Sequence, residues 1–399
     1  MNEGKPLEGI TRLESALETL RAAGDDNADV AEVAEKLARV LVLAGRRDEA
    51  HPHFELALGL AEALDLPEVF VNALTTKGLV VVQQDRLAEA RILLEGAVAR
   101  AVAEDLPRAA ARALNNLGVI LESADRYAET LDVVTAAIEQ ARRAGDRVWE
   151  LILRTGCLST LVLLGRWHEA LDSAAELEGI EGIELARGQL QSVLEIDCWR
   201  GNVEQARRRL ESDADLGESE EAQARSGYRL HEAMVLRREG KVRAALEALQ
   251  TVIAARDTLG IRFLHVKLAI VEAIECALDL GDAEKVHELL DLVDALRPGE
   301  RPPLLAAHAS RFRARLTGTP REAEAEYAGA IDLFRELNTP FWLAATQLEQ
   351  AEWLLEHDRA DEAQPLLEEA RQTFERLEAR PCLERAVEAL TRREPAVVV

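Results

Sequence analysis

The sequence predicts an all-α protein, organised as an α-solenoid of tandem helix-turn-helix repeats. One observation is a short segment of the form Gly/Asp-Arg-x-x-Glu-Ala, which recurs along the chain at a nearly constant spacing. A second is that the apolar residues after each occurrence follow offsets of three and four, which is the helical period. A third is the lack of any sustained alternating pattern, since the runs of valine at 80–82 and 397–399 are short and isolated.

The recurring segment occurs nine times, and neighbouring copies are separated by 40, 40, 40, 36, 39, 41, 37 and 40 residues. We call its first residue the marker. The markers are Gly45, Asp85, Asp125, Gly165, Gly201, Gly240, Gly281, Gly318 and Asp358. Gly or Asp suits a helix C-terminus, where the chain adopts a left-handed conformation or needs a polar cap. We therefore expect each marker to form the tight turn between the two helices of one repeat.

The residues after each marker define one buried helix face. Five residues on, the side chains are mostly small: Ala50, Ala90, Thr130, Ala170, Ala206, Ala245, Val286, Ala323 and Ala363. Four residues further come Phe54, Leu94, Val134, Ala174, Leu210, Leu249, Leu290, Tyr327 and Leu367. A small residue lets two helices approach closely, and the larger one fills the space beside it. The next apolar position is broken by Asp213, so we expect an irregular, exposed loop over 210–224.

Proline marks the joints between repeats. Leu66-Pro67, Leu106-Pro107, Arg297-Pro298 and Thr339-Pro340 are expected to end one helix and begin the next. Pro52 and Pro365 both lie seven residues after a marker. We expect them near the first turn of the second helix, where a missing N–H is tolerated.

These patterns divide the chain into three parts. Residues 1–28 are interpreted as a truncated first repeat that supplies only its second helix. Residues 29–378 form nine tandem helical hairpins of about 36–41 residues, and residues 379–399 form a capping helix, over 381–390, and a short tail. Because a solenoid normally has a cap at each end, we expect the chain to derive from a longer polypeptide. Its N-terminal edge is then a candidate surface for self-association.

The charge balance limits the classes of partner. The chain has 48 Lys and Arg against 73 Asp and Glu, a formal net charge of −25. This argues against direct binding to nucleic acid, which needs a dense basic surface, and favours a basic partner or solubility alone. No apolar run approaches the roughly 20 residues of a membrane span, and the N-terminus has no signal core. We expect a soluble, cytoplasmic protein without a membrane partner.

The sequence does not predict catalysis, a cofactor or a metal site. Gly240-Lys241 is not a phosphate-binding loop, because Val235 stands where the first glycine is needed. Cys157, Cys198, Cys276 and Cys382 are far apart, whereas zinc sites use closely spaced pairs. We expect these cysteines to be small core residues. The abundant acids follow the pattern of solvated helix faces, so we predict that the protein is not an enzyme.

Two segments carry a family resemblance. Ala113-Leu114-Asn115-Asn116-Leu117-Gly118 before Asp125-Arg126-Tyr127, and the stretch from Gly165 to Ala170, resemble the tetratricopeptide repeat in a longer form of about 40 residues. Residues 327–390, with Phe341-Trp342 and Ala351-Glu352-Trp353, are similar to the C-terminal helical-repeat sensor region of large bacterial signalling ATPases. The resemblance implies a right-handed solenoid with a sensor or scaffold role. The ATPase and cyclase domains of those proteins have no counterpart in this chain, so the resemblance carries neither activity over.

In tetratricopeptide-like arrays the first helix of each pair lines the concave surface. By this resemblance, the candidates for binding a peptide or protein are Arg39, Asn72, Gln83, Arg112, Asn115, Gln191, Arg237, Arg238 and Arg315. Asn can pair with backbone amides, and Arg can bind carboxylates through two hydrogen bonds. The alternative is that these are ordinary exposed helix residues. The tryptophans, at 149, 167, 199, 342 and 353, are expected to pack between helices rather than form a ligand cage.

The function that fits these observations is a non-catalytic helical-repeat scaffold that binds a protein or peptide on its concave face, in bacterial signalling or regulation. One alternative is a regulatory or sensor fragment of a nucleotide-handling signalling enzyme, an ATPase or nucleotide cyclase. Another is a small-molecule sensor with a pocket near residues 210–224.

Overall fold

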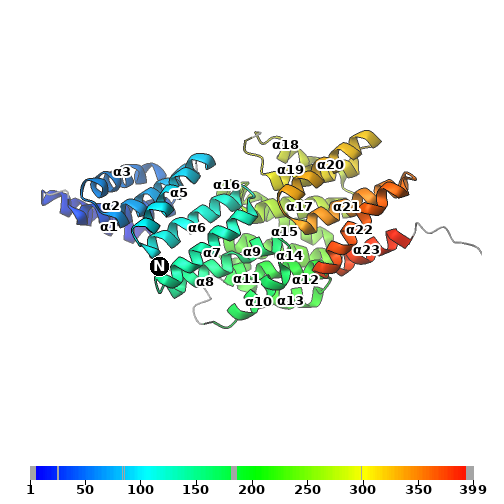
Figure 1. The fold of residues 1–399 in the computed structure, drawn as a ribbon, viewed down its shortest axis with the longest axis horizontal. Helices are drawn as coiled ribbons and strands as arrows, with labels where there is room; N and C mark the ends of the chain where they lie inside the picture. Colours follow the sequence, from blue (N-terminus) through cyan, green and yellow to red (C-terminus); the bar gives the residue numbers. More distant parts are fainter. Residues whose placement is uncertain are drawn as a thin grey trace, which may run out of the picture. The chain divides into compact units, whose positions relative to one another are not determined.

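The computed structural model describes residues 6–24, 27–82, 84, 86–180, 187–297 and 299–391 (Figure 1). All regular secondary structure in these ranges is helical. A single helix, α1 (Pro6–Ala22), precedes the first pair. The first four pairs are α2 (Ala28–Leu43) with α3 (Arg47–Ala63), α4 (Pro67–Val82) with α5 (Leu87–Ala103), α6 (Pro107–Ser123) with α7 (Tyr127–Arg143), and α8 (Arg147–Gly156) and α9 (Leu158–Leu163) with α10 (Trp167–Leu177).

The helix pairs continue to the C-terminal end of the described chain. The fifth pair joins α11 (Arg187–Leu190), a 3₁₀ helix η2 (Gln191–Val193) and α12 (Leu194–Arg200) to α13 (Val203–Ser212). The next pairs are α14 (Ala222–Arg238) with α15 (Val242–Ala254), α17 (Leu264–Asp279) with α18 (Ala283–Asp294), α19 (Pro303–Leu316) with α20 (Pro320–Glu336), and α21 (Pro340–Glu356) with α22 (Ala360–Leu377). A short α16 (Arg256–Leu259) follows α15, and α23 (Arg380–Thr391) follows α22. The fold is an α-solenoid.

The markers form the turns inside the helix pairs, as the sequence predicts. Seven of them have a positive φ: Gly45, Asp125, Gly165, Gly201, Gly240, Gly281 and Asp358. Gly318 does not, because the chain leaves α19 through an extended Thr317 with ψ of 136°. Asp85 lies outside the described residues. Three joints between pairs also contain a residue with a positive φ, which lies between 52° and 54° at Asp65, Asp105 and Asn338.

The two downstream positions form the core of the array. Every residue five or nine positions after a marker is buried. Asp213 breaks the next position, as predicted, and its carboxylate pairs with Arg187 at 3.0 Å. The expectation of an exposed loop over 210–224 is wrong in one part, because Ala214–Glu218 form a 3₁₀ helix, η3. Gly217 is buried there, and a Cβ atom on it would lie 2.9 Å from the Tyr228 ring.

Pro52 and Pro365 lie one turn deeper in their helices than expected. The second helices begin at Arg47 and Ala360, only two residues after the marker, so each proline is the sixth residue of its helix. The helix continues past both positions, and the proline removes one donor from its backbone ladder.

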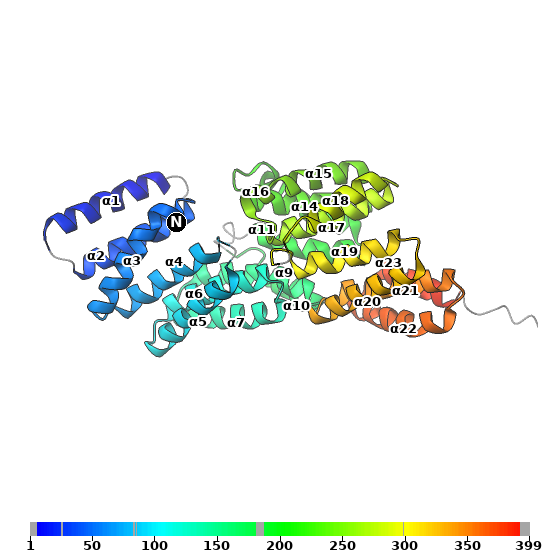
Figure 2. The same cartoon turned by 90° about the horizontal axis from the view of Figure 1, so that it is seen from above.

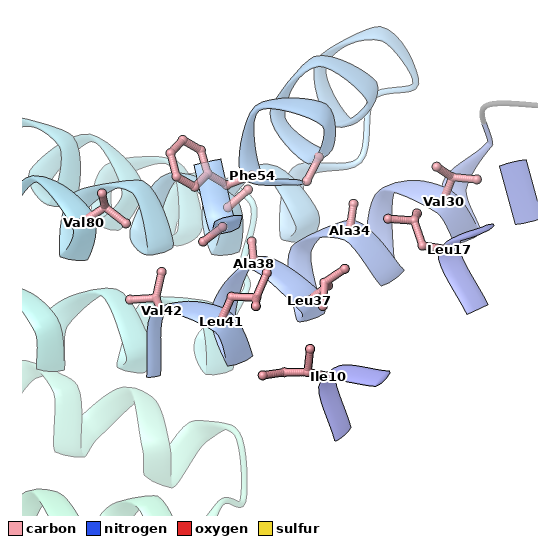
Figure 3. Close-up of a cluster of buried hydrophobic side chains, with 13 residues drawn as sticks. Ile10, Leu17, Val30, Ala34, Leu37, Ala38, Leu41, Val42, Phe54 and Val80 are labelled. Carbon is pink, nitrogen blue, oxygen red and sulfur yellow. The ribbon is translucent and has the colours of Figure 1, made fainter. Parts of the chain in front are cut away.

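The first helix packs against the array through a small apolar cluster (Figure 3). Ile10 and Leu17 of α1 point toward α2, where they meet Val30, Ala34 and Leu37. Phe54 of α3 and Val80 of α4 extend the same cluster. A fully buried aliphatic side chain contributes roughly 1.5–3 kcal/mol, so α1 is held by its own apolar face.

The chain divides into two compact units, which are described separately. Unit 1 comprises Met1–Leu121 and Glu129–Leu153, and unit 2 comprises Glu122–Ala128 and Arg154–Val399. In unit 2 the helices from α19 to α23 pack successively on one another (Figure 2, yellow to red). None of the described helices combines the length and the apolarity needed to cross a bilayer.

Within unit 2, three early turns dock onto the starts of three late helices, and we call these contacts the seam. Asp125 accepts a 2.8 Å hydrogen bond from the backbone N–H of Leu304 in α19. A Cβ atom on Gly165 would lie 2.5 Å from Cγ of Pro340, the first residue of α21. A Cβ atom on Gly201 would lie 3.2 Å from Cγ of Pro381 in α23. Repeats far apart in sequence are therefore in direct contact.

A buried ion pair fixes the first contact of the seam. Lys267 of α17 and Asp125 are fully buried at their side chains, and Lys267 Nζ donates to Asp125 Oδ1. The hydroxyl of Tyr127 also donates to Asp125 Oδ1, at 2.7 Å. Burial, together with the Asp125 carboxylate, raises the pKa of Tyr127 well above its ordinary value, so the phenol stays a donor.

Candidate binding cavities

The larger cavity lies in unit 2 and has a volume of about 420 Å³. Its walls come almost entirely from first helices, α12, α14, α17, α19 and α21, together with α23. Five arginines line it: Arg237, Arg238, Arg311, Arg315 and Arg385. Six acids line it: Glu272, Glu275, Asp279, Glu349, Glu352 and Glu356. The aromatic lining residues are Trp199, Tyr327, Phe341, Trp342 and Trp353.

The charged side chains form a ladder across neighbouring first helices. Arg237 of α14 donates to Asp279 Oδ2 at 2.7 Å and to Glu275 Oε2 at 3.2 Å, both on α17. Arg311 of α19 reaches back to Glu275 Oε1 at 2.6 Å. On its other side, Nε and Nη2 of Arg311 bind Glu349 of α21 at 2.9 and 2.6 Å. Glu275 thus accepts from both neighbouring first helices, α14 and α19, because offsets of three and four keep these charges on one face.

This ladder holds its members ionised. Burial by itself would raise the pKa of Glu275, but the nearby Arg311, Arg237 and Arg315 outweigh it, and the pKa lies well below its usual range. Burial would lower the pKa of Arg311, but Glu349 and Glu275 raise it further. Both groups are therefore fully charged at neutral pH.

Two buried donors of the cavity wall have no hydrogen-bond partner among the described residues: Nη1 of Arg311 and Nε1 of Trp342. Arg311 is only 4 % exposed and Trp342 only 6 % exposed. The guanidinium of Arg311 lies 5.5 Å from the centre of the Trp342 ring. A buried donor without an acceptor costs about 1–3 kcal/mol, so both atoms lower the stability of this wall.

The aromatic wall is a packed cluster. Trp199 stacks on Phe341 with ring centroids 4.5 Å apart, and it meets Trp342 edge-on at 5.7 Å. Trp167 stacks behind Trp199 at 5.4 Å and donates its N–H to the carbonyl of Val162. Trp167 therefore packs between helices as expected, whereas Trp199 and Trp342 pack and also line the cavity.

The smaller cavity lies in unit 1 and has a volume of about 190 Å³. Arg39, Asn72 and Arg112 line it together with Arg108 and Trp149. Arg112 donates to Asn72 Oδ1 at 2.9 Å, to Thr76 Oγ1 at 2.7 Å and to Glu35 Oε1 at 3.1 Å. Burial, and then the positive charge of Arg39, lower the pKa of Arg112 to about 10, against the favourable effect of Glu35. The protein itself satisfies this guanidinium.

The nine sequence-predicted site residues separate into groups. Arg39, Asn72 and Arg112 meet in the unit 1 cavity, and Arg237, Arg238 and Arg315 meet in the unit 2 cavity. Asn115 is half-buried on α6 and lines neither. Gln191 lies in the 3₁₀ helix η2 and is 3 % exposed. Its side-chain amide donates a hydrogen bond to Asp213, so it makes a contact inside the fifth pair. Gln83 lies outside the described residues.

Sequence reasoning missed the acids and Arg311, although a signal for them exists. Glu272 and Glu349 both lie nine residues before a marker, Glu275 and Glu352 six, and Asp279 and Glu356 two. Arg237 and Arg315 both lie three residues before a marker. The inner face of the first helix is thus basic in one repeat and acidic in the next, and this alternation builds the ladder.

The remaining chemistry-bearing residues are scattered. All four cysteines are free thiols, and Cys157, Cys198 and Cys276 are buried as expected. Burial raises the pKa of the Cys198 thiol to about 12. Within the described ranges, no three His, Cys, Asp or Glu side chains gather in a way that could hold a metal ion.

Comparison with known proteins supports the repeat architecture. Residues 1–63 match the tetratricopeptide repeat family. No curated protein sequence matches the chain. A human IFIT1 dimer solved with m7Gppp-AAAA is 14% identical, with 97% of this chain and 87% of that chain covered and a TM-score of 0.53. A human IFIT1 dimer solved with PPP-AAAA is 13% identical, with 98% of this chain and 86% of that chain covered and a TM-score of 0.50.

A third similar structure is the apo form of the quorum sensor NprR from B. thuringiensis. It is 14% identical, with 92% of this chain and 94% of that chain covered and a TM-score of 0.43. The likeness to the IFIT1 structures concerns the fold, which is a solenoid of tetratricopeptide-like helix pairs.

Proposed function

We propose that this protein is a non-catalytic, cytoplasmic scaffold that binds a protein or peptide on the surface formed by its first helices, in bacterial signalling or regulation. The observation that carries the proposal is the unit 2 cavity, which five consecutive first helices line and whose walls combine a packed aromatic cluster with paired arginines and acids. Repeat arrays supply extended binding surfaces of this kind.

The electrostatics of the cavity support a binding role over a catalytic one. A general acid or base needs a pKa near the working pH. Here the pKa of Glu275 is depressed and that of Arg311 is raised, because each faces several opposite charges. Neither group can exchange a proton at neutral pH, and each holds the other in position.

The charge of the cavity supports a peptide or protein over a nucleic acid. The two IFIT1 structures contain m7Gppp-AAAA and PPP-AAAA. In this chain, six acids outnumber five arginines around the cavity, and the whole chain has a net charge of −25. A polyphosphate would meet repulsion both at the site and during approach.

Site-specific crosslinking in cells tests the proposal. A photo-reactive amino acid replaces Ala345, which is half-buried in the cavity wall, or Glu369, which is exposed on the second helix α22. We expect one recurrent protein adduct from position 345 and none from position 369. Equal adduct patterns from both positions, or no adduct from 345, would contradict the proposal.

The N-terminal edge is proposed as a surface for self-association. The test is sedimentation over a hundredfold range of protein concentration. A shift to a dimer that is lost when exposed α1 residues are replaced supports it, and a monomer at every concentration excludes it.

A further inference from the structure

The unit 1 cavity contains one arginine that has no acidic partner. Arg39 of α2 lines this cavity and is half-buried. Its side chain makes no hydrogen bond or ion pair with any described residue, and none of its nitrogens belongs to the buried atoms that lack a partner. The guanidinium of Arg39 is therefore both unpaired and accessible. A cation that is partly removed from water is stabilised by an anion beside it.

The other two arginines of this cavity lie near acids. Arg112 donates to Glu35 at 3.1 Å, and both side chains are buried. Arg108 is largely exposed, and its Nε lies 3.9 Å from Oδ2 of Asp146. The remaining acid of the wall, Glu68, is exposed in the first turn of α4, where solvent and salt screen its charge. Arg39 is thus the one cation among the lining residues without a nearby acid.

The charge of Arg39 also acts on its neighbour in the cavity. It lowers the pKa of Arg112, which shows that the two guanidinium groups lie close enough to repel each other. The partly buried position strengthens this repulsion, because fewer water molecules screen it. An anion bound to Arg39 would relieve the repulsion, and the pair of Arg112 with Glu35 would stay intact.

The charge count favours a ligand with one negative charge. A carboxylate carries a single charge, and its two oxygens match the planar fork of one guanidinium. A phosphate dianion would bring a second negative charge toward Asp146 and Glu68, and no second unpaired arginine lines the cavity to compensate it. The unit 1 cavity is therefore better matched to a carboxylate than to a phosphate.

The rest of the wall fits a small apolar body. Trp149 is half-buried in it, and Ala109, Ala111 and Ala141 supply short, buried side chains. The volume of about 190 Å³ is smaller than that of pockets for drug-sized ligands. The cavity therefore has room for a small acid rather than for a length of peptide chain.

We propose that the unit 1 cavity binds a small apolar monocarboxylic acid, whose carboxylate pairs with Arg39 and whose apolar body packs beside Trp149. This inference goes beyond the proposed function, because it concerns a small molecule and a separate site. It does not depend on the unit 2 cavity.

The probes are small acids and their matched analogues. Phenylacetate and hexanoate are the acids, phenylacetamide and hexanamide are the neutral analogues, and phenyl phosphate is the dianion. The indole N–H signals of the ¹⁵N-tryptophan-labelled full chain are followed by NMR during titration to about 10 mM, which detects millimolar dissociation constants. Trp149→Phe assigns the signal of that residue. We expect the two acids to move the Trp149 signal, and the amides and phenyl phosphate to bind at least tenfold more weakly.

Substitutions of arginine locate the interaction. Arg39→Gln should weaken binding of the acids at least tenfold, because it removes a charge-assisted hydrogen bond. Arg39→Lys keeps the charge and loses the fork, so we expect an intermediate affinity. The matched control is Arg47→Gln, since Arg47 is exposed on the second helix α3 and lines neither cavity. It should change the Kd by less than twofold.

Thermal unfolding separates a binding role of Arg39 from a structural one. Because Arg39 has no partner and repels Arg112, Arg39→Gln should not lower the Tm of the ligand-free protein. A lower Tm, together with an unchanged affinity for the acids, would assign Arg39 to the fold and overturn the inference.

The other outcomes are equally decisive. Equal binding of acids and amides, or tighter binding of phenyl phosphate, overturns the preference for a carboxylate. Equal weakening by Arg39→Gln and Arg47→Gln overturns the role of the cavity. An acetylated tripeptide with a free C-terminus is titrated in parallel, and binding of this peptide without binding of the small acids overturns the small-acid ligand. Absence of binding by every probe overturns the inference and leaves the proposed function to the crosslinking test at Ala345.

Discussion

At the scale of single residues, Asp125 shows how a repeated turn position acquires a second role. It is one of the nine markers and shares the left-handed conformation of six other markers, with φ of 59°. Its carboxylate also binds Lys267, Tyr127 and the N–H of Leu304 at the start of α19. A negative charge at a helix N-terminus is favourable, because the unpaired N–H groups carry partial positive charge. One side chain thus compensates a buried cation and caps a helix.

Asp125→Asn should lower the free energy of unfolding by about 3–5 kcal/mol, because it removes the carboxylate that is hydrogen-bonded to the buried ammonium of Lys267. Urea unfolding measures the loss. The matched variant is Asp125→Asn combined with Lys267→Met, which removes both charges and should recover part of the stability. If the double variant loses as much as the sum of the two single variants, the pair is not coupled.

His308 illustrates a buried residue that is sensitive to pH. It is 1 % exposed, and both ring nitrogens lack a hydrogen-bond partner among the described residues. Burial, and then the charge of Arg311, lower its pKa well below the ordinary value, although Glu275 opposes this. The folded protein therefore keeps the ring neutral, while the unfolded chain takes up a proton below about pH 6.5.

Stability should fall as the pH drops below about 6.5. The contribution of neutral His308 is fully present above that pH, and it decreases by about 1.4 kcal/mol per pH unit below it, until the folded-state pKa is reached. Urea unfolding at pH 7.5, 6.5 and 5.5 measures this slope. His308→Leu should reduce the slope by the same amount, and an unchanged slope would show that other groups cause the pH dependence.

At the scale of elements, the turns fall into two kinds. Four of the six glycine markers face open space, as at Gly240, where an added Cβ atom would meet nothing within 4 Å. The Gly165 turn instead presses on the start of α21, so its lack of a side chain serves packing as well as backbone conformation.

Gly165→Ala should therefore cost more than Gly240→Ala. Both glycines have a positive φ, 67° and 77°, so both variants pay about 1–2 kcal/mol for a left-handed alanine. Only Gly165→Ala adds the clash with Pro340, which should raise its cost by about 1–3 kcal/mol. Thermal and urea unfolding compare the stability of the two variants. Equal losses of stability would mean that the contact between Gly165 and Pro340 rearranges to accommodate the added methyl group.

The sequence predicts the helices and turns well because each of them depends on residues that are close together in the sequence. The markers, the buried small residues such as Ala50 and the proline joints all have local periodic signatures. The seam has none, since Gly165 and Pro340 look like any other turn and helix start. The site was predicted in part: Arg237, Arg238 and Arg315 line the cavity. Whether the side chains of Arg311 and Trp342 find hydrogen-bond partners depends on tertiary packing, which the local periodicity of the sequence does not encode.

At the scale of the whole molecule, the net charge of −25 dominates long-range interactions. Arginines in unit 2 are offset by acids in the next repeat, so no uninterrupted basic surface arises around its cavity. Despite the similar fold of the IFIT1 structures, this charge pattern disfavours phosphate chains.

The full chain should therefore not bind m7Gppp-AAAA measurably at micromolar concentration, even in 50 mM salt, where electrostatic attraction is strongest. Fluorescence anisotropy of a labelled RNA measures this. A charge-matched single-stranded DNA serves as the comparison, and salt-sensitive binding of either would refute the prediction.

The seam also limits how unit 2 can vary in length. In an ordinary solenoid each repeat contacts only its neighbours, so a copy can be gained or lost and the rest is undisturbed. Here the three docked pairs are 179, 175 and 180 residues apart in the chain. Excising one hairpin between residues 204 and 300 would move all three late helices by a full repeat relative to their early turns. Unit 2 therefore has a fixed number of helix pairs, because gaining or losing one pair would break all three contacts of the seam.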